Sequence, residues 1–242
     1  MWHSTQVASP EGPLDDRIRR IWLDAARGGT AFPGEPTLAR QLQAGRPAVR
    51  EALVRLEAEG LIHKRQGAET MINRAAVEIA ARLDQQMDNE DIIKAMGRVA
   101  TMDVLEAEVV WLEGEDAAAL EVAAGMRALR VAKRWLADGV PVVLAINLIP
   151  LLDDRSPVDL DAGESLFRLI ERLGHQTVDW ELAWPGATNL EPPISGWLEQ
   201  EPGQAALTLR MVGVSRAGHR AYLANEFHVP QAFRYGLIRS VR

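Results

Sequence analysis

The segment from Gly45 to Gly67 constrains the fold more than any other part of the chain. Its apolar residues Val49, Leu53 and Leu56 recur at i, i+4 and i+7, which predicts a helix with one buried face. Because a glycine accepts the left-handed geometry of a helix end, we expect this helix to stop at Gly60. The residues that follow predict a short strand, a turn and a returning strand at Met71-Ile72, with 61–65 as the first strand.

Two arginines mark the beginning of this helix. Arg46 and Arg50 are four residues apart, so they share one flank of the helix beside its apolar stripe. Two further helices are predicted upstream, one that opens at Pro13 and ends at Gly28-Gly29, and one that begins near Pro36. A buried helix with arginines at its N-terminal end, followed by a basic hairpin, is typical of a winged helix-turn-helix, in which the recognition helix meets base edges.

The composition excludes several classes of protein. The chain has no cysteine, which rules out disulfides, thiolate metal sites and cysteine nucleophiles. No stretch approaches the roughly 20 apolar residues that a membrane helix needs, and the N-terminus lacks a basic region followed by an apolar one. We therefore expect a cytoplasmic protein that has no membrane segment, metal site or cofactor.

The net charge of −7 is unevenly divided along the chain. Residues 1–73 hold 10 Lys+Arg and 9 Asp+Glu, a net charge of +1, whereas the remainder holds 17 and 25, a net charge of −8. The acidic excess thus lies outside the predicted DNA-binding part. Since that part is only weakly basic, we expect modest non-specific DNA affinity and specificity that comes from two copies binding together.

The second half of the chain predicts an α+β domain built on an antiparallel sheet. The β-rich runs 127–136 and 140–149 flank Asp138-Gly139, which is a strong hairpin signal. A second hairpin is predicted from 207 to 228 across Ala217-Gly218, a helix from Ser165 to Leu173, and a last strand from Phe233 to Val241. The Ala-rich stretch from residue 74 predicts a helix. We expect the following divisions: a disordered lead-in at 1–12, the winged helix-turn-helix at 13–73, a linker at 74–98 and the α+β domain at 99–242.

The N-terminal half resembles a known family. Residues 46–62, which read RPAVREALVRLEAEGLI, are similar to the DNA-binding domain of GntR-type bacterial transcription regulators. Upstream, 32–39 (FPGEPTLA) resembles the start of that family's second helix, and 65–67 (RQG) resembles its wing. The resemblance implies contacts with operator DNA by the two helix arginines.

The C-terminal half resembles the UTRA ligand-sensing domain of the HutC branch of those regulators. The similar segments are LADGVP at 136–141, the strand end at Pro150, ESLF at 164–167 and the hairpin at 207–228. This resemblance covers about 99–242 and implies a fold related to chorismate lyase. It also implies a pocket for a small-molecule effector and a homodimer formed mainly through this domain.

The candidate DNA-binding residues lie on the recognition helix and the wing. A guanidinium can bind guanine O6 and N7 through two parallel hydrogen bonds, which suits Arg46 and Arg50. The alternative is a solvated helix flank. At the wing, Lys64 and Arg65 would serve phosphates or the minor groove, or be an ordinary solvated pair. The full candidate set is Arg46, Ala48, Arg50, Lys64, Arg65 and Gly67.

The sequence departs from the GntR pattern at three places that bear on the operator sequence and the wing contact. Gly34-Glu35-Pro36 stands where Ser-Glu-Arg is usual, so one phosphate-facing arginine is missing. Pro47-Ala48 replaces two threonines, which removes two hydroxyl donors. Glu69 follows the wing tip, where it would repel phosphates.

The candidate effector site combines a helix start with residues of the predicted strands. The backbone N–H groups at Ser165 favour an anionic group, unless Glu164 merely helps to cap a surface helix. By resemblance, Lys133 matches one of two basic pocket residues, whereas Trp135 stands in place of the other and Ala145 replaces a carboxylate. These replacements indicate a less anionic effector than a sugar phosphate. The full candidate set is Lys133, Trp135, Asn147, Glu164, Ser165, Tyr222 and His228.

Three functional hypotheses follow. The first is a transcription regulator, most simply a repressor, whose dimer reads a palindromic double-stranded operator and whose DNA binding responds to an effector. The second is an enzyme, which the absence of spaced metal ligands, nucleophile motifs and phosphate loops disfavours. The third is a constitutive DNA-binding dimer with a degenerate sensor pocket.

Overall fold

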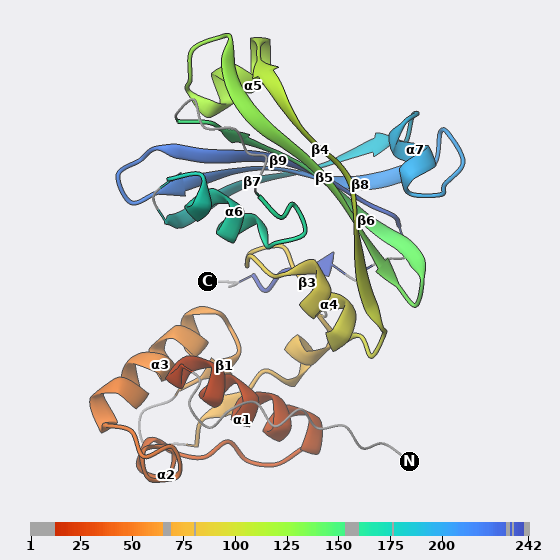
Figure 1. Cartoon of the computed structure of the whole chain (residues 1–242). Helices are drawn as coiled ribbons and strands as arrows, with labels where there is room; N and C mark the ends of the chain where they lie inside the picture. The colour runs from red at the N-terminus through yellow and green to blue at the C-terminus, as the bar shows by residue number, and fades with distance from the viewer. Residues whose placement is uncertain are drawn as a thin grey trace. The chain divides into compact units, whose positions relative to one another are not determined.

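The structure is a computed structural model of the whole chain, and it describes residues 13–64, 69–79, 81–152, 160–175, 177–230, 233 and 235–239. The chain forms two compact units (Figure 1). The first takes in Met1–Asp84 and Tyr235–Arg242, and the second Gln85–Arg234. Each unit has its own fold and its own apolar core.

The first unit is built on three helices and a small hairpin. Its helices are α1 (Leu14–Gly28), α2 (Glu35–Gln41) and α3 (Arg46–Ala58), and the hairpin pairs β1 (Ile62–His63) with β2 (Met71–Ile72) in antiparallel register. The apolar stripe of α3 is buried as expected, with Val49, Leu53 and Leu56 at most 1% exposed. The indole of Trp22 donates to the carbonyl of Leu61 at 2.8 Å and so joins α1 to the start of the hairpin.

Gly60 ends the recognition helix as predicted. Its φ is +72°, a conformation that L side chains rarely adopt, and a Cβ there would lie 2.6 Å from Cγ2 of Ile238. Ile238 belongs to the C-terminal segment, which returns to this unit. Both the backbone geometry and the packing therefore require glycine at this position.

The segment after β2 was predicted wrongly as a helix. It forms a short 3-10 helix, η1 (Arg74–Glu78), and a two-residue strand, β3 (Ala81–Arg82). β3 pairs in parallel with β10 (Tyr235–Gly236), which is all that the described residues show of the strand expected from Phe233 to Val241. Helix propensity is a weak preference, and pairing with a strand more than 150 residues away overrides it here.

The compact units also differ from the expected divisions. The change between units falls after Asp84 rather than at residue 98, and α4 (Asn89–Ala95) lies in the second unit. The C-terminal segment from Tyr235 belongs to the first unit because β10 pairs with β3. The expected lead-in at 1–12 lies outside the described residues.

The second unit is a six-stranded antiparallel sheet with the strand order β4-β5-β6-β9-β8-β7. The strands are β4 (Ala100–Leu112), β5 (Met126–Ala137), β6 (Val140–Pro150), β7 (Val178–Asn189), β8 (Ala205–Ser215) and β9 (Arg220–His228). Both predicted hairpins are present. Asp138 and Gly139 have φ of +54° and +81°, as the tight turn between β5 and β6 requires.

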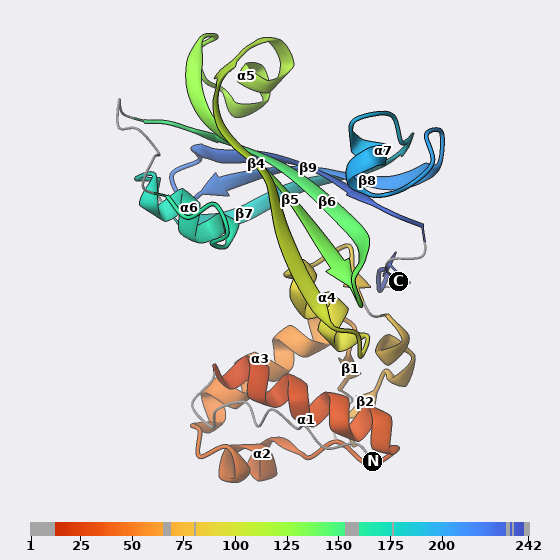
Figure 2. The same ribbon diagram turned by 45° about the vertical axis from the view of Figure 1, so that its right-hand side comes forward.

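Helices cover both faces of this sheet (Figures 1 and 2). On one face, α6 (Leu166–Arg172) covers an apolar cluster that includes Leu129, Ile149 and Tyr222, and α4 lies on the same side. On the other face, α5 (Gly114–Leu120) covers a second cluster around Leu148 and Leu223. The short α7 (Ile194–Trp197) lies on this second face too, where Arg134 donates to the carbonyl of Trp197 at 2.9 Å.

Candidate functional site

The N-terminal turn of α3 presents an exposed edge. Arg46, Ala48 and Arg50 are all exposed, whereas Val49 between them is fully buried. This alternation follows from the helical period, since the buried stripe packs against α1 and α2 and leaves the arginine flank outside. The two guanidinium groups are therefore not sequestered inside the protein.

Arg50 makes a bidentate ion pair with Glu35 at the start of α2. Its Nε lies 3.1 Å from one carboxylate oxygen and its Nη2 lies 2.9 Å from the other. The Arg50 side chain stays 66% exposed, against 21% for Glu35. In the sequence, Glu35 stands out only as part of a departure from the family pattern, and this partner could not be predicted, because the two residues meet only when α2 and α3 pack.

Glu35 marks a locally positive region. Its pKa is lowered chiefly by the hydrogen bond from Arg50; desolvation opposes this shift, and the charges of Arg50, Lys64 and Arg46 each lower the pKa a little further. Arg46 has no hydrogen bond or ion pair among the described residues. The structure thus brings three of the predicted DNA-binding side chains, Arg46, Arg50 and Lys64, into the electrostatic range of one carboxylate.

The wing is described only in part. Lys64 follows directly after β1, and its backbone N–H donates to Glu57 of α3 at 2.8 Å, which anchors the strand to the recognition helix. Its side chain is half-buried. The predicted wing residues Arg65 and Gly67 lie outside the described residues, and Glu69, at their C-terminal side, is exposed.

In the second unit, Lys133 lies on β5, the second strand from one edge of the sheet. The strand register places it opposite Ala145 of β6, which in turn pairs with Glu226 of β9, so the three side chains share a row and a face. Lys133 is 3% exposed, and its ammonium group donates to the backbone carbonyl of Glu164. Burial lowers the pKa of Lys133, while the charges of Asp161, Asp88 and Glu164 oppose that shift.

Glu164 and Ser165 lie at the start of α6 but do not form a simple anion site. Ser165 caps the helix, because its hydroxyl accepts from the backbone N–H of Arg168 at 3.4 Å. One oxygen of Glu164 pairs with Arg172 at 2.9 Å, and the other is buried without a hydrogen-bond partner among the described residues. An anion at this two-turn helix would meet the negative charge of Glu164.

Four further predicted residues share the face of Lys133. Asn147 donates to the carbonyl of Val131 at 3.4 Å, and Tyr222 donates to Glu181. His228 lies 3.0 Å from Glu226. Trp135 occupies the next row, opposite Val143. Except for the half-buried Trp135, these side chains are at most 4% exposed.

Two acidic residues of this face were not in the predicted set. Glu226 accepts from Asn89 of α4 at 3.1 Å and contacts His228, which shows that it faces inward; its strand parity with His228 was the available signal. Burial raises the pKa of Glu181, and burial together with Glu181 raises that of Tyr222. Glu181 carried no sequence signal, since it lies on an edge strand among exposed residues.

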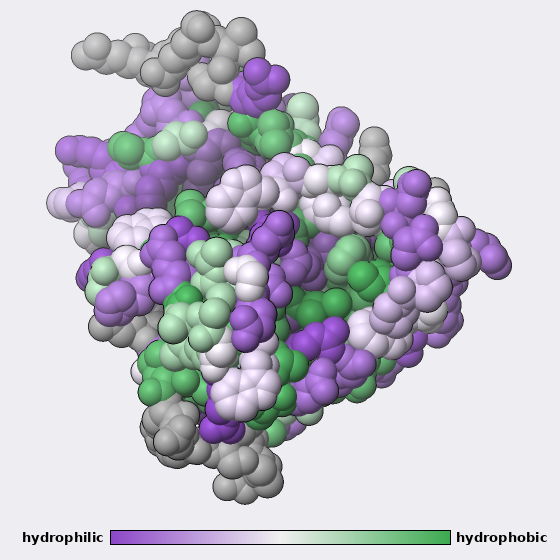
Figure 3. Space-filling model, turned by 90° about the horizontal axis from the view of Figure 1, so that it is seen from above, coloured by the Kyte–Doolittle hydropathy of each residue, from purple (hydrophilic) through white to green (hydrophobic). Residues whose placement is uncertain are grey.

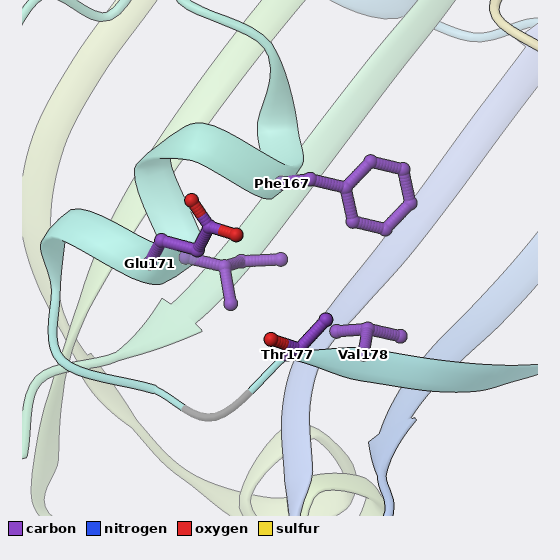
Figure 4. Close-up of a pocket in the computed structure, with 5 residues that line it drawn as sticks. Phe167, Glu171, Thr177 and Val178 are labelled. Carbon is purple, nitrogen blue, oxygen red and sulfur yellow. The ribbon is translucent and has the colours of Figure 1, made fainter.

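A pocket beside α6 adjoins the Tyr222 end of this cluster, because its lining residue Phe167 packs edge-on against the Tyr222 ring at 6.3 Å between ring centroids. Figure 4 shows it between Phe167 and Glu171 of α6 and the start of β7 at Thr177 and Val178. Its volume is about 200 Å³, below the range of about 300–1,000 Å³ that is usual for small-molecule sites. None of the predicted effector residues lines it. Within the described parts of the chain, no group of three or more His, Asp or Glu residues could hold a metal ion.

A three-helix unit with a small wing and an exposed arginine edge, joined in one chain to an α+β sheet domain with buried polar groups, defines a winged-helix regulator with a sensor domain. Family comparison gives the same class. The UTRA domain matches residues 95–234, and the bacterial regulatory proteins of the gntR family match residues 16–72. The chain belongs to the GntR-type bacterial regulatory proteins that carry a UTRA domain.

Individual relatives agree with this assignment. The HTH-type transcriptional regulator Mce2R of Mycobacterium tuberculosis is 46% identical over 83 residues, which cover 33% of this chain and 35% of that protein. The match thus spans about a third of the length of the curated relatives. Among solved structures, YydK from Bacillus subtilis has a TM-score of 0.72 at 15% identity, and PhnF from Mycobacterium smegmatis 0.60 at 18%. Each covers 95% of this chain and 100% of the other, and shows the shared fold.

Among the residues that the structure describes, none of the helices has the length and apolar character to span a membrane.

Proposed function

We propose that this transcription regulator is a repressor, that it binds a palindromic operator as a homodimer, and that a small-molecule effector in its UTRA domain controls binding. The observation that carries the DNA-binding part is the exposed edge of α3, where Arg46, Ala48 and Arg50 stand clear of a fully buried helix face. Such an edge suits insertion of the helix start into the major groove. Lys64, Arg65 and Gly67 would support it from the wing.

The DNA-binding proposal is tested with duplexes taken from upstream of the protein's own gene. We expect the Arg46→Ala/Arg50→Ala double variant to lose at least about a hundredfold in affinity, measured by fluorescence anisotropy at fixed salt. The matched control is Arg20→Ala/Arg27→Ala, which removes the same charge from exposed positions of α1. Equal affinity of the two double variants would refute the assignment of Arg46 and Arg50.

The effector site would be the face of the sheet that carries Lys133, Trp135, Asn147, Tyr222 and His228, next to Glu164 and Ser165. The support is that these residues, far apart in the sequence, share one face and that Lys133 reaches the α6 start. A thermal-shift screen of metabolites tests it, because a ligand that binds only the folded state raises the melting temperature. A stabilising metabolite should lose its effect on Lys133→Met and weaken operator binding by the wild type.

The homodimer would use the sheet face that carries α5 and α7. Trp180, Leu182 and Trp184 alternate along the edge strand β7 on that face and are 46–58% exposed. Figure 3 shows apolar residues, in green, among hydrophilic ones on the side seen from above. A row of large exposed apolar side chains is typical of an interface between protein chains.

One observation favours the alternative of a constitutive DNA-binding dimer. Lys133, Asn147, Tyr222 and His228 are buried and each already has a partner within the protein. A filled site of this kind would leave the operator affinity unchanged by any metabolite. A broad screen with neither thermal stabilisation nor operator release would favour this alternative over the effector-controlled repressor.

A further inference from the structure

The Arg50–Glu35 pair leaves a defined part of the guanidinium free. Arg50 donates to Glu35 through Nε and Nη2, so both hydrogens of Nη1 and one of Nη2 remain. One hydrogen of Nη1 and the free hydrogen of Nη2 lie side by side on the end of the guanidinium, an edge that can bind guanine O6 and N7 through two parallel bonds. The carboxylate thus occupies the Nε–Nη2 side of the guanidinium and leaves the Nη1–Nη2 end available to bind a base.

The exposure of the pair argues against a mainly structural role. The Arg50 side chain is 66% exposed, and exposed ion pairs contribute little to stability because water screens them. Glu35 is also held in place, since it is the first residue of α2, is only 21% exposed and is followed directly by a proline. A fixed carboxylate therefore restrains a long side chain that would otherwise sample many rotamers.

We propose that Glu35 is a positioning residue that fixes the Arg50 guanidinium for recognition of a guanine in each operator half-site. This inference rests on the proposed DNA binding and goes beyond it by assigning base specificity to a residue that carries the wrong charge for DNA. Pre-ordering reduces the entropy lost when Arg50 binds a base, and it disfavours bases that need another orientation of the fork.

The competing explanation is that Glu35 merely neutralises Arg50 and must be displaced by DNA. The two explanations differ in what the loss of Glu35 does. If the carboxylate orients Arg50, its removal weakens discrimination at one base pair. If it only competes with DNA, removal strengthens binding to every sequence equally and leaves the base preferences unchanged.

The experiment is a selection from a random-sequence duplex library by the full-length protein, followed by sequencing. We expect the wild type to prefer guanine at one position of each half-site and Arg50→Ala to lose that preference. Glu35→Gln should reduce the preference at the same position about tenfold and leave the other positions unchanged. Glu35→Asp, which keeps the charge on a shorter side chain, should retain part of it, while binding to unselected library DNA should not fall in either variant.

The matched control is Glu51→Gln, which removes an exposed carboxylate of α3 that makes no hydrogen bond or ion pair with the described residues. It should leave all base preferences unchanged. An unaltered preference in Glu35→Gln, or an equal gain on all sequences, would overturn the inference while the DNA-binding function stands. A wild type that selects no sequence would contradict the proposed function and this inference with it. Melting temperatures of the variants check that each one folds.

Discussion

The recognition helix and the UTRA sheet present their candidate residues in opposite ways. On α3, Arg46 and Arg50 are exposed, and the only partner of Arg50 among the described residues is Glu35 on the neighbouring helix. On the sheet, Lys133 and Tyr222 are at most 3% exposed and hydrogen-bonded within the domain. The arginines of the helix are therefore accessible to a binding partner, whereas the polar groups of the sheet already form hydrogen bonds within the protein.

This difference follows from the size of the ligand that each region would bind. Duplex DNA is larger than the domain and can be met only by a protruding surface, where water satisfies the arginines until DNA replaces it. A small molecule must be enclosed, so its site lies among buried groups that need protein partners in its absence. Substitutions in the sheet should consequently change stability, and those on the helix edge should change binding with little effect on stability.

The largest effect on stability is expected at Gly213 of β8. A Cβ there would lie 2.0 Å from the Tyr222 ring, so Gly213→Ala forces apart two packed strands. We expect the melting temperature to fall by about 5 °C or more, measured by differential scanning calorimetry. Gly196→Ala in α7, where a Cβ meets nothing within 4 Å, is the control and should not destabilise. Equal effects of both changes would contradict the close packing of the sheet.

The next effect concerns association. Trp184 is 50% exposed on the sheet face proposed for the dimer, so Trp184→Lys places a charge in that interface. We expect the dimer to dissociate at a concentration at least about tenfold higher, measured by analytical ultracentrifugation. Trp111→Lys is the control, since Trp111 is 66% exposed on the opposite face of β4. If only the Trp111 variant dissociates, the interface lies on the other face.

A smaller effect of the opposite sign is expected at Glu181. Burial raises its pKa in the folded state above the ordinary 4.5, so the folded state holds this proton more tightly than the unfolded state does. The free energy of unfolding therefore falls as the pH rises from about 4.5 through the raised pKa of the folded state. At neutral pH the folded protein stays destabilised, because it then holds a buried negative charge. Glu181→Gln removes the charge but still accepts from Tyr222.

We expect Glu181→Gln to raise the melting temperature at pH 7 by about 2–4 °C, and the difference to vanish as the pH falls below about 4.5. Thermal melts across this pH range measure it. The exposed Glu201→Gln serves as the control and should show no pH-dependent gain. A gain that stays the same at every pH would exclude the charge of Glu181 as its cause.

The smallest effect is expected for an ion pair of the DNA-binding unit. Arg55 is bidentate to Asp15, with distances of 2.8 and 2.7 Å, yet half of its side chain is exposed. We expect Arg55→Ala to shift the melting temperature by less than about 2 °C, because solvent screens exposed pairs. A shift as large as that of Gly213→Ala would show that surface ion pairs hold the helices together. Substitutions on the helix surface would then change stability as much as those in the sheet do.

Much of the fold could be predicted because its signals are local. The stripe of Val49, Leu53 and Leu56 predicted the buried face of α3, and Asp138-Gly139 predicted the β5–β6 hairpin. The helix predicted for the Ala-rich stretch after residue 74 was wrong, since the strand in that stretch forms by pairing with Tyr235-Gly236, far along the chain. Of the candidate site residues, those on the helix edge were predictable from the helical period. Glu181 and Glu35 were not, because nothing near them in the sequence distinguishes them from other surface carboxylates.

The sequence by itself determined the two folds, the division of charge between them and the arginine flank of the recognition helix. Periodicity, glycine turns and local composition act over a few residues, so they can be followed along the chain. Only the tertiary structure decided that Glu35 forms an ion pair with Arg50, and that Lys133, Ala145 and Glu226 lie side by side on three neighbouring strands. These contacts join residues that are 12 to 81 positions apart, and strand register and helix packing, not local sequence, bring such residues together.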